Sequence, residues 1–229
     1  LSAYKWLLVS QGRDPQDAAN WTDFLRFVGA RYSTASAIAF YSIVGEPLAP
    51  TTPEATARLV AFYHTLTDDL YAADSGHHLI AAGGLIHLNN ETAATPWWHE
   101  IYALPHNDIV AFKTYSQSDL DLLPALASEA RHLNKPLADE EFGMPQNAGD
   151  GTASGQAYNG LRMSRAQFYA TVYNSGSHYG VASFAFWSLG CQLSATSFAV
   201  SPLTPAVWQV VSAHAPATRV PWPHPSPPC

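Results

Sequence analysis

The sequence predicts an α/β fold in which parallel strands alternate with helices. Short β-rich apolar runs, most of them bounded by Gly, Pro or Asn, alternate with longer stretches whose apolar residues recur at helical spacing. The 229 residues are 47% hydrophobic and only 13% charged, which supplies ample apolar material for a core and excludes a disordered chain. The order of the runs indicates repeated βα units.

Six apolar runs are predicted to be strands, and five periodic stretches are predicted to be helices. The strands are Trp6–Ser10, Ala37–Val44, His78–Gly83, Asp108–Phe112, Pro136–Glu140 and Ala182–Trp187. The helices are Trp21–Tyr32, Pro53–Ala73, Leu120–Leu133, Ser164–Asn174 and Pro205–Ala213. The second helix is the best defined, because Thr52 can cap it, Pro53 suits its first turn and Glu54 favours the positive end of its dipole.

Acidic and aromatic residues gather where the predicted strands end. Glu46 follows one strand and Glu141 another, while Tyr115 and Trp187 close two more. The carboxyl ends of parallel strands in a βα barrel meet on one face, so these side chains are expected to converge. Two carboxyl groups facing each other can cleave a glycosidic bond if one protonates the leaving oxygen and the other attacks the sugar. For either acid alone, a helix cap or a salt bridge is the simpler interpretation.

Two strings carry a family resemblance. Ile38–Pro47, which ends in Gly-Glu-Pro, resembles the fourth strand of clan A glycoside hydrolases, especially family 5, where Asn-Glu-Pro carries the acid/base. Lys135–Gly143 resembles the seventh strand, with its Glu-Phe-Gly nucleophile motif. The resemblance implies Glu46 as acid/base and Glu141 as nucleophile. Strand alternation favours Glu141 over Glu140, because Asp139 and Glu141 are expected to point one way and Glu140 the other.

Three further strings resemble family strands in the same order. His78–Gly84 is similar to the fifth strand and Asp108–Tyr115 to the sixth, whose Tyr hydrogen-bonds the nucleophile. Gly180–Gly190 is similar to the eighth, whose Trp forms a platform for the sugar. The resemblance implies these roles for Tyr115 and Trp187, and an indole face suits the CH face of a pyranose. Packing in the barrel core is the alternative for Trp187.

The departures from the family pattern are equally specific. Gly45 replaces the family Asn that holds the sugar 2-hydroxyl, and Lys113 stands where His is usual. If Trp6–Ser10 is the third strand, the first two βα units are absent. We therefore expect a TIM-type barrel that is truncated at its N-terminus or open, with about six parallel strands over residues 1–217. Self-association is one way to cover the open edges. The Pro-rich residues 218–229 are expected to form a tail or linker.

Two more residues are candidates for contact with sugar. His87 follows the predicted fifth strand, with a solvated loop as the alternative, and Trp98 belongs to a Trp pair in the same predicted loop, with a packing plug as the alternative. The histidines match no zinc spacing, and glycine-rich nucleotide motifs are missing, so we expect neither metal nor cofactor. Cys191 and Cys229 are the only cysteines, and whether they pair is left open.

Charge and composition exclude two classes of partner. The chain has 11 Lys and Arg against 18 Asp and Glu, a net charge of −7, with no basic run for a phosphate backbone. No apolar stretch approaches the roughly 18 residues of a membrane-spanning helix. Neither nucleic acid nor a membrane is expected as a partner. Secretion is suggested only by the family resemblance and the Pro-rich tail.

The leading expectation is a retaining β-glycoside hydrolase that acts on a β-1,4-linked glucan or mannan chain. The substrate-binding residues would be Tyr115, Trp187, Lys113, His87 and Trp98. The alternative is a non-catalytic, carbohydrate-binding relic of the barrel, motivated by Gly45, Lys113 and the missing strands. A β-glycosidase that releases single sugars is a third interpretation. The sequence does not choose among the glycans, because loop shape determines the subsites.

Overall fold

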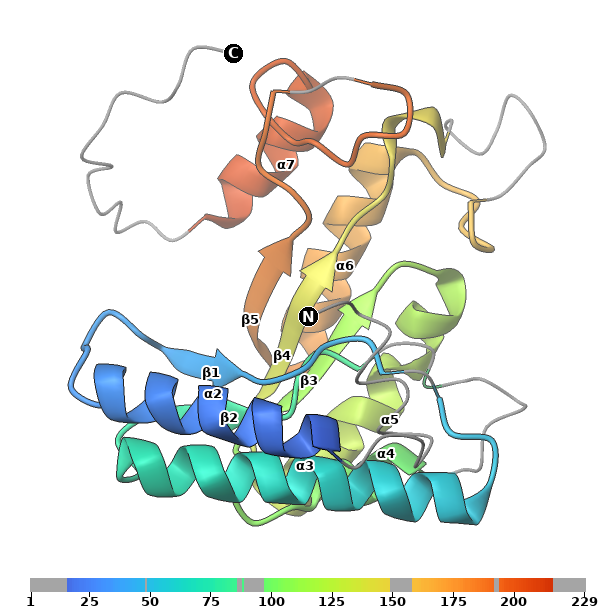
Figure 1. Ribbon diagram of the computed structural model, residues 1–229. Helices are drawn as coiled ribbons and strands as arrows, with labels where there is room; N and C mark the ends of the chain where they lie inside the picture. The colour runs from blue at the N-terminus through green and yellow to red at the C-terminus, as the bar shows by residue number, and fades with distance from the viewer. Residues whose placement is uncertain are drawn as a thin grey trace.

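The computed structural model describes residues 16–47, 49–85, 88, 97–148, 158–191 and 194–215. Its strands are all parallel and pair as a sheet of two and a sheet of three (Figure 1). The first sheet contains β1 (Phe40–Ser42) and β2 (Leu79–Ala81). The second contains β3 (Val110–Thr114), β4 (Leu137–Phe142) and β5 (Val181–Phe186), in that order. The predicted strand Trp6–Ser10 lies outside the described residues.

Main-chain hydrogen bonds join the two sheets. The amide of Leu85 donates to Ala111 O at 3.2 Å, and the amide of Lys113 donates to Leu85 O at 3.1 Å. The spatial order of the five strands therefore follows the order in the chain, and their carboxyl ends lie at one edge. The predicted parallel βα architecture is confirmed, and the described strands form an open arc with no closed barrel.

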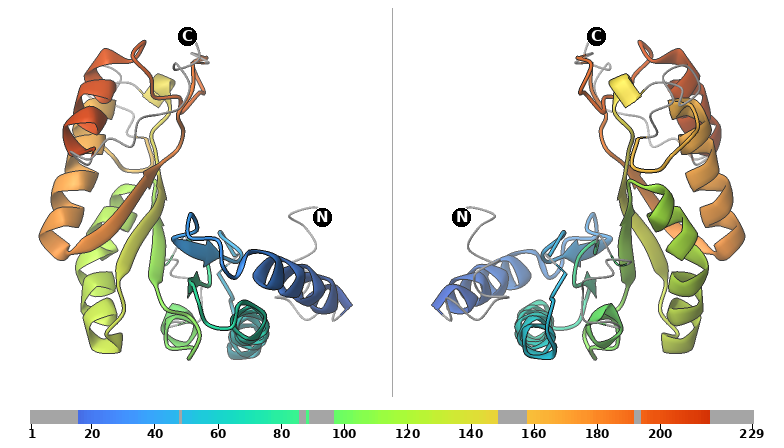
Figure 2. Two further views of the ribbon diagram at one scale, coloured as in Figure 1. Left: turned by 90° about the vertical axis from the view of Figure 1, so that its left-hand side faces the viewer. Right: turned by 90° about the vertical axis from the view of Figure 1, so that its right-hand side faces the viewer.

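In the described ranges six helices connect and flank the strands. They are α2 (Gln16–Tyr32), α3 (Pro53–Asp74), α4 (Trp97–Tyr102), α5 (Gln117–Leu133), α6 (Arg165–Tyr179) and α7 (Pro205–His214), with a short 3-10 turn at Gln146–Ala148. Figure 2 shows α5 and α6 on one side of the β3–β4–β5 sheet, and β1 and β2 with α2 and α3 on the other. All five predicted helices are present, with ends that differ by a few residues.

The short helix α4 corrects the sequence analysis, which placed Trp97, Trp98 and His99 in a loop. Both indoles are buried in the core that also holds the apolar face of α3. The six residues of α4 are too few for a helical period to be visible in the sequence. Burial of two large aromatic side chains, each contributing about 150 to 250 Å² of area, stabilises this helix in place of a surface loop.

An apolar stripe on α3 forms the centre of the larger core. Leu59, Tyr63, Leu66 and Leu70 are fully buried, whereas Val60 is half-buried at the margin. A second core lies between α6, α7 and β4, around Phe142. No helix in the described part of the chain is long and apolar enough to cross a membrane. Cys191 is disulfide-bonded.

Replacing Thr52 with Ala should lower the free energy of unfolding by about 1 kcal/mol. The Thr52 hydroxyl accepts a hydrogen bond from the amide of Ala55 at 3.2 Å and so caps α3, with Pro53 in its first turn. Chemical denaturation of the two proteins measures the difference. Thr51→Ala, one residue earlier and exposed, is the matched control. Equal losses in the two variants would contradict a capping role for Thr52.

Candidate active site

Four of the predicted site residues converge at the carboxyl ends of the strands. The Lys113 ammonium donates to Glu46 Oε1 at 3.0 Å and to Glu141 Oε2 at 2.9 Å. The phenol of Tyr115 donates to the other oxygen of Glu141, Oε1. Glu46 and Glu141 are far apart in the sequence, and the parallel arrangement of β1, β3 and β4 brings them to one ammonium group. The arrangement is two carboxylates bridged by a cation.

The backbone of Glu46 holds its side chain in place. Glu46 lies shortly after β1 with a φ of 56°, in the left-handed region that residues other than glycine rarely occupy. Its amide donates to Gly84 O at 3.0 Å, a bond that supports this conformation. Such a conformation costs on the order of 1 to 3 kcal/mol and is found most often at functional positions. The Glu46 side chain remains 49% exposed, while that of Glu141 is 24% exposed.

The environment keeps Lys113 charged and Tyr115 protonated. Burial by itself would lower the pKa of Lys113, whose side chain is 11% exposed, but hydrogen bonds to Glu141 and Glu46 outweigh burial and raise it. Burial, followed by the hydrogen bond to Glu141, raises the pKa of Tyr115. The nucleophile candidate Glu141 therefore accepts hydrogen bonds from an ammonium and from a phenol that retains its proton.

A β-bulge in β4 changes the direction of the neighbouring acid, Glu140. Phe112 pairs with Asp139 and Lys113 pairs with Glu141, so Glu140 has no counterpart on β3. The predicted alternation, with Asp139 and Glu141 on one side, is therefore wrong. Both glutamates line the same hollow of about 350 Å³, which is lined by Phe40, Ser42, Gly45, Lys113, Glu140, Glu141, Ser183 and Ala185. The extra residue of the bulge brings the side chain of Glu140 to the same side of the strand as that of Glu141.

Glu140 and Ser42 were missed by the sequence analysis as members of this site. The Ser42 hydroxyl donates to Glu140 Oε2 at 2.9 Å, and Glu140 Oε1 is buried without a partner among the described residues. Burial raises the pKa of Glu140, although Ser42, a backbone hydrogen bond from Gly84 and the charge of Lys113 oppose it. Ser42 could have been found from the period of two along β1, but no local signal reveals the bulge at Glu140.

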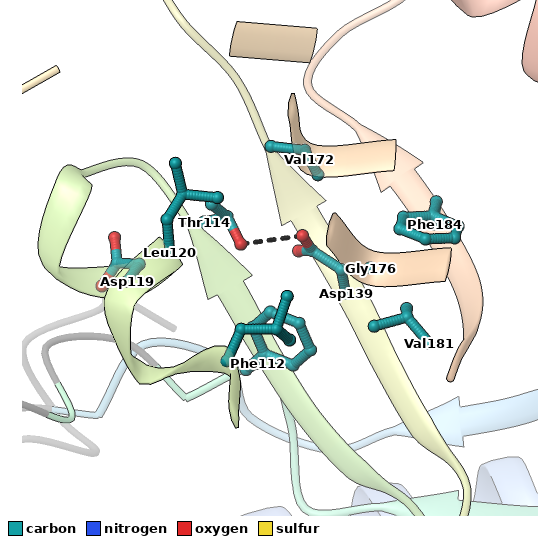
Figure 3. Close-up of a pocket in the computed structure, with 10 residues that line it drawn as sticks. Phe112, Thr114, Asp119, Leu120, Asp139, Val172, Gly176, Val181 and Phe184 are labelled. Atoms are coloured by element: carbon teal, nitrogen blue, oxygen red, sulfur yellow. Dashed lines mark hydrogen bonds between the residues drawn. The ribbon is translucent and has the colours of Figure 1, made fainter. Parts of the chain in front are cut away.

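Asp139 points away from the hollow into a small apolar space between the sheet and helices α5 and α6 (Figure 3). The Thr114 hydroxyl donates to Asp139 Oδ2 at 2.8 Å, and Asp139 is only 1% exposed. Burial raises its pKa well above the usual 3.8, and the nearby Asp119 and Glu140 add to this effect. Burial thus favours the protonated form of this carboxyl group, which packs directly behind the site.

Asp139→Asn should be more stable than the wild type at neutral and alkaline pH, and the difference should shrink as pH falls toward 4. With a pKa raised by folding, Asp139 binds its proton more tightly in the folded state, so its contribution to stability is complete below the unfolded pKa and is lost as pH rises. The amide of Asn cannot ionise. Thermal unfolding between pH 4 and 8 measures this, with exposed Asp121→Asn as control. A parallel pH profile for wild type and Asp139→Asn would contradict it.

The remaining predicted residues lie in three different situations. Trp187 directly follows β5, its amide donates a hydrogen bond to Phe142 O at 2.7 Å, and the residue is 52% exposed. Trp98 is 6% exposed, stacks on His99 with ring centres 3.7 Å apart and belongs to the core. Trp98 is therefore a packing residue of the core, and it does not line the hollow. His87 lies outside the described residues.

The described residues contain no group of three His, Cys, Asp or Glu side chains that could hold a metal ion. Three carboxyl groups, those of Glu46, Glu140 and Glu141, surround the single ammonium of Lys113. Carboxyl groups therefore outnumber the ammonium group at this site. Such a set of groups suits proton transfer and nucleophilic attack at a neutral substrate.

Solved structures of glycoside hydrolases share this arrangement of strands and helices. An endo-1,4-β-D-mannanase from Thermotoga petrophila RKU-1 has a TM-score of 0.64 and 15% identity, over 88% of this chain and 65% of that one. This chain has the fold of the βα-barrel glycoside hydrolases. A family 5 mannosidase from Rhizomucor miehei has a TM-score of 0.62 and 15% identity, over 88% and 58%.

The structures that share this fold also include an endoglucanase. Cel5A from Thermotoga maritima, solved with cellobiose, has a TM-score of 0.58 and 13% identity, over 91% of this chain and 70% of that one. The chain spans 50 to 65% of the length of the first mannanases it matches. No family profile and no curated protein matches the sequence. The similarity to these solved structures confirms the resemblance to family 5 at the level of the fold.

Proposed function

We propose that this protein is a retaining β-glycoside hydrolase that cleaves β-1,4-linked mannan or glucan chains. One observation carries the proposal: Glu46 Oε1 and Glu141 Oε2 lie 3.0 and 2.9 Å from the same Lys113 nitrogen. The shared nitrogen limits the separation of these two oxygens to about 6 Å. Retaining enzymes hold their two carboxyl groups about 5 to 5.5 Å apart, whereas inverting enzymes need roughly 6.5 to 9.5 Å to admit a water.

The surroundings of each carboxyl group favour one role for each. Glu141 is the less exposed and is held by Lys113 and Tyr115, which suits a nucleophile that must stay ionised and correctly oriented. Glu46 is the more exposed, which suits a group that exchanges protons with water and with the leaving group. Glu141 attacks the anomeric carbon while Glu46 gives its proton to the departing oxygen. Glu46 then removes a proton from the water that releases the sugar from Glu141.

The neighbouring structures support the substrate class. The solved structures similar to this one include endo-1,4-β-mannanases, a mannosidase, an endoglucanase and a β-glucuronidase; the endoglucanase was solved with cellobiose and the mannosidase with mannosyl-fructose. A β-1,4-linked hexose chain is the substrate common to most of these names. The exposed indole of Trp187 offers a flat apolar surface on which the CH face of such a sugar can stack.

The test is hydrolysis by the wild type, followed by the stereochemistry of the first product. Aryl β-glucosides, aryl β-mannosides and soluble β-1,4-glucans and mannans are incubated with the protein, and the anomer formed first is read by proton NMR. We expect the β-anomer to appear first and to mutarotate afterwards. The α-anomer as first product would overturn the retaining mechanism.

A second function, carbohydrate binding without turnover, is favoured by the open arc of strands. In the described residues neither β1 nor β5 pairs with a further strand to close the barrel. This alternative predicts that the protein binds cello- or manno-oligosaccharides in calorimetry and leaves them intact after prolonged incubation. The hydrolysis experiment therefore separates the two functions directly.

A further inference from the structure

Gly84 makes room for the side chain of Lys113, and Gly45 lies beside the same side chain. A Cβ atom added at Gly84 would lie 2.9 Å from Lys113 Cγ and 3.1 Å from Cε, and one added at Gly45 would lie 3.6 Å from Cε and Nζ. Neither glycine has a positive φ, so the backbone conformation does not require glycine at these positions. Space for Lys113 requires glycine at Gly84, whereas a Cβ at Gly45 would be in ordinary van der Waals contact with the lysine. The stem of Lys113 therefore lies in a narrow seat between the segments that follow β1 and β2.

The ammonium of Lys113 has one more N–H group than its two glutamate partners accept. An ammonium carries three N–H groups, and Glu46 and Glu141 accept two of them. Within the described ranges the third has no acceptor, and Lys113 lines the hollow between the strands. A half-buried donor without an acceptor is a favourable contact for a hydroxyl group that enters the hollow.

We propose that Lys113 is a positioning and substrate-binding residue that holds Glu46 and Glu141 at their working separation and donates its third N–H to the sugar bound between them. This inference rests on the proposed function. The anomeric carbon lies between the two carboxyl groups, and the hydroxyl on the adjacent ring carbon, C2, is the nearest ring hydroxyl to it. A nitrogen about 3 Å from an oxygen of each carboxyl group is within reach of that hydroxyl.

The charges around Lys113 give the inference a pH signature. The groups that face it are Glu46 after β1, Tyr115 after β3, and Glu140 and Glu141 on β4. Tyr115 keeps its proton, so the ammonium offsets the mutual repulsion of the carboxylates. Without it, no cation lies between the two carboxyl groups of the Glu46–Glu141 pair to offset their repulsion. Both limbs of the pH profile of kcat/KM then move to higher pH.

The experiment compares the wild type with Lys113→Met, whose unbranched side chain fills the same seat without a charge. The substrates are an aryl β-glycoside and its 2-deoxy analogue. On the parent substrate, kcat/KM should fall on the order of 10- to 100-fold, the loss expected for one hydrogen bond to a charged donor. On the 2-deoxy analogue the difference between the two proteins should narrow, because the wild type has lost the same contact. Both pH limbs should shift upward.

Two further variants distinguish a change in the position of Lys113 from a general loss of stability. Gly84→Ala, which crowds Lys113 Cγ, should reproduce part of the loss. Lys135→Met makes the same change at a half-buried lysine that donates to Tyr102 O and Leu104 O, at 2.6 and 2.9 Å, beside the amino end of β4. It should lower the melting temperature and leave the pH profile and the 2-deoxy discrimination of the folded protein as in the wild type.

The outcomes distinguish this inference from the proposed function. Wild-type hydrolysis with unchanged pH limbs and unchanged 2-deoxy discrimination in Lys113→Met would overturn the inference alone. If the wild type does not hydrolyse any β-glycoside, the proposed function fails, and calorimetry with cellobiose and mannobiose tests Lys113 instead. Weaker binding by Lys113→Met would then support the contact with sugar. Equal binding, or no binding by either protein, would overturn it.

Discussion

Glu141→Gln should lose nearly all hydrolysis of β-glycosides, with kcat/KM reduced by about 10⁴-fold or more, the order found when one member of a catalytic unit is removed. The amide of Gln fits the space of the carboxyl group and can still accept a hydrogen bond from Tyr115, but it is a much weaker nucleophile. Loss of activity with an unchanged melting curve would therefore show that the variant is folded and lacks the nucleophile. Initial rates with an aryl β-glycoside, together with thermal unfolding, measure both.

Glu140→Gln is the matched control for Glu141→Gln, because the two acids are adjacent and line the same hollow. The carboxyl of Glu140 has its pKa raised by burial and accepts a hydrogen bond from Ser42, which a Gln oxygen can also accept. The loss in Glu140→Gln should stay within about tenfold, the range expected for one neutral hydrogen bond. If Glu140→Gln were inactive and Glu141→Gln active, Glu140 and not Glu141 would be the nucleophile.

Chemical rescue gives the nucleophile a stereochemical test. In Glu141→Ala the missing carboxylate leaves space on that face of the sugar, and added azide can attack the anomeric carbon while Glu46 protonates the departing aryl oxygen. The product is a glycosyl azide of α configuration. Rescue of this kind identifies Glu141 as the attacking group, whereas a β-azide product would be inconsistent with its role.

Glu46→Ala should show a loss that depends on the leaving group. Proton donation to the departing oxygen contributes about 10² to 10⁴-fold, and a poor leaving group needs it most. Oligosaccharides should therefore lose most of their turnover, while an activated aryl glycoside such as a dinitrophenyl glycoside keeps a fast first step. The slope of log kcat/KM against leaving-group pKa measures this dependence and should steepen in the variant.

Azide also distinguishes Glu46 from Glu141. In Glu46→Ala the sugar bound to Glu141 has lost the base that activates water, and azide, which needs no base, should accelerate its release as a β-glycosyl azide. Glu46→Gln serves as the size-matched control and should show the same leaving-group dependence with weaker azide rescue, because its side chain still fills the space. An equal loss for all leaving groups would contradict the acid/base role of Glu46.

The sequence by itself predicted the order of elements and named Glu46 and Glu141 as the candidate acids. Local periodicity identified every described helix except α4, and apolar runs identified β1 to β5, because both signals depend on neighbours a few residues apart. Glu46, Tyr115, Glu141 and Trp187 were predicted as site residues because they lie at or just after the ends of such runs and match motifs of the family that the chain resembles. Trp98 could not be placed in this way, since burial depends on contact with α3 and the rest of the core.

Only the tertiary structure decided how these residues meet. The bulge that turns Glu140 toward the hollow depends on pairing between β3 and β4, and strand alternation alone predicted the opposite direction. The bridge from Lys113 to both carboxylates, and the space that Gly84 leaves for its side chain beside Gly45, join four segments distant in the chain. Such contacts arise from long-range packing and strand register, which no local pattern of residues encodes.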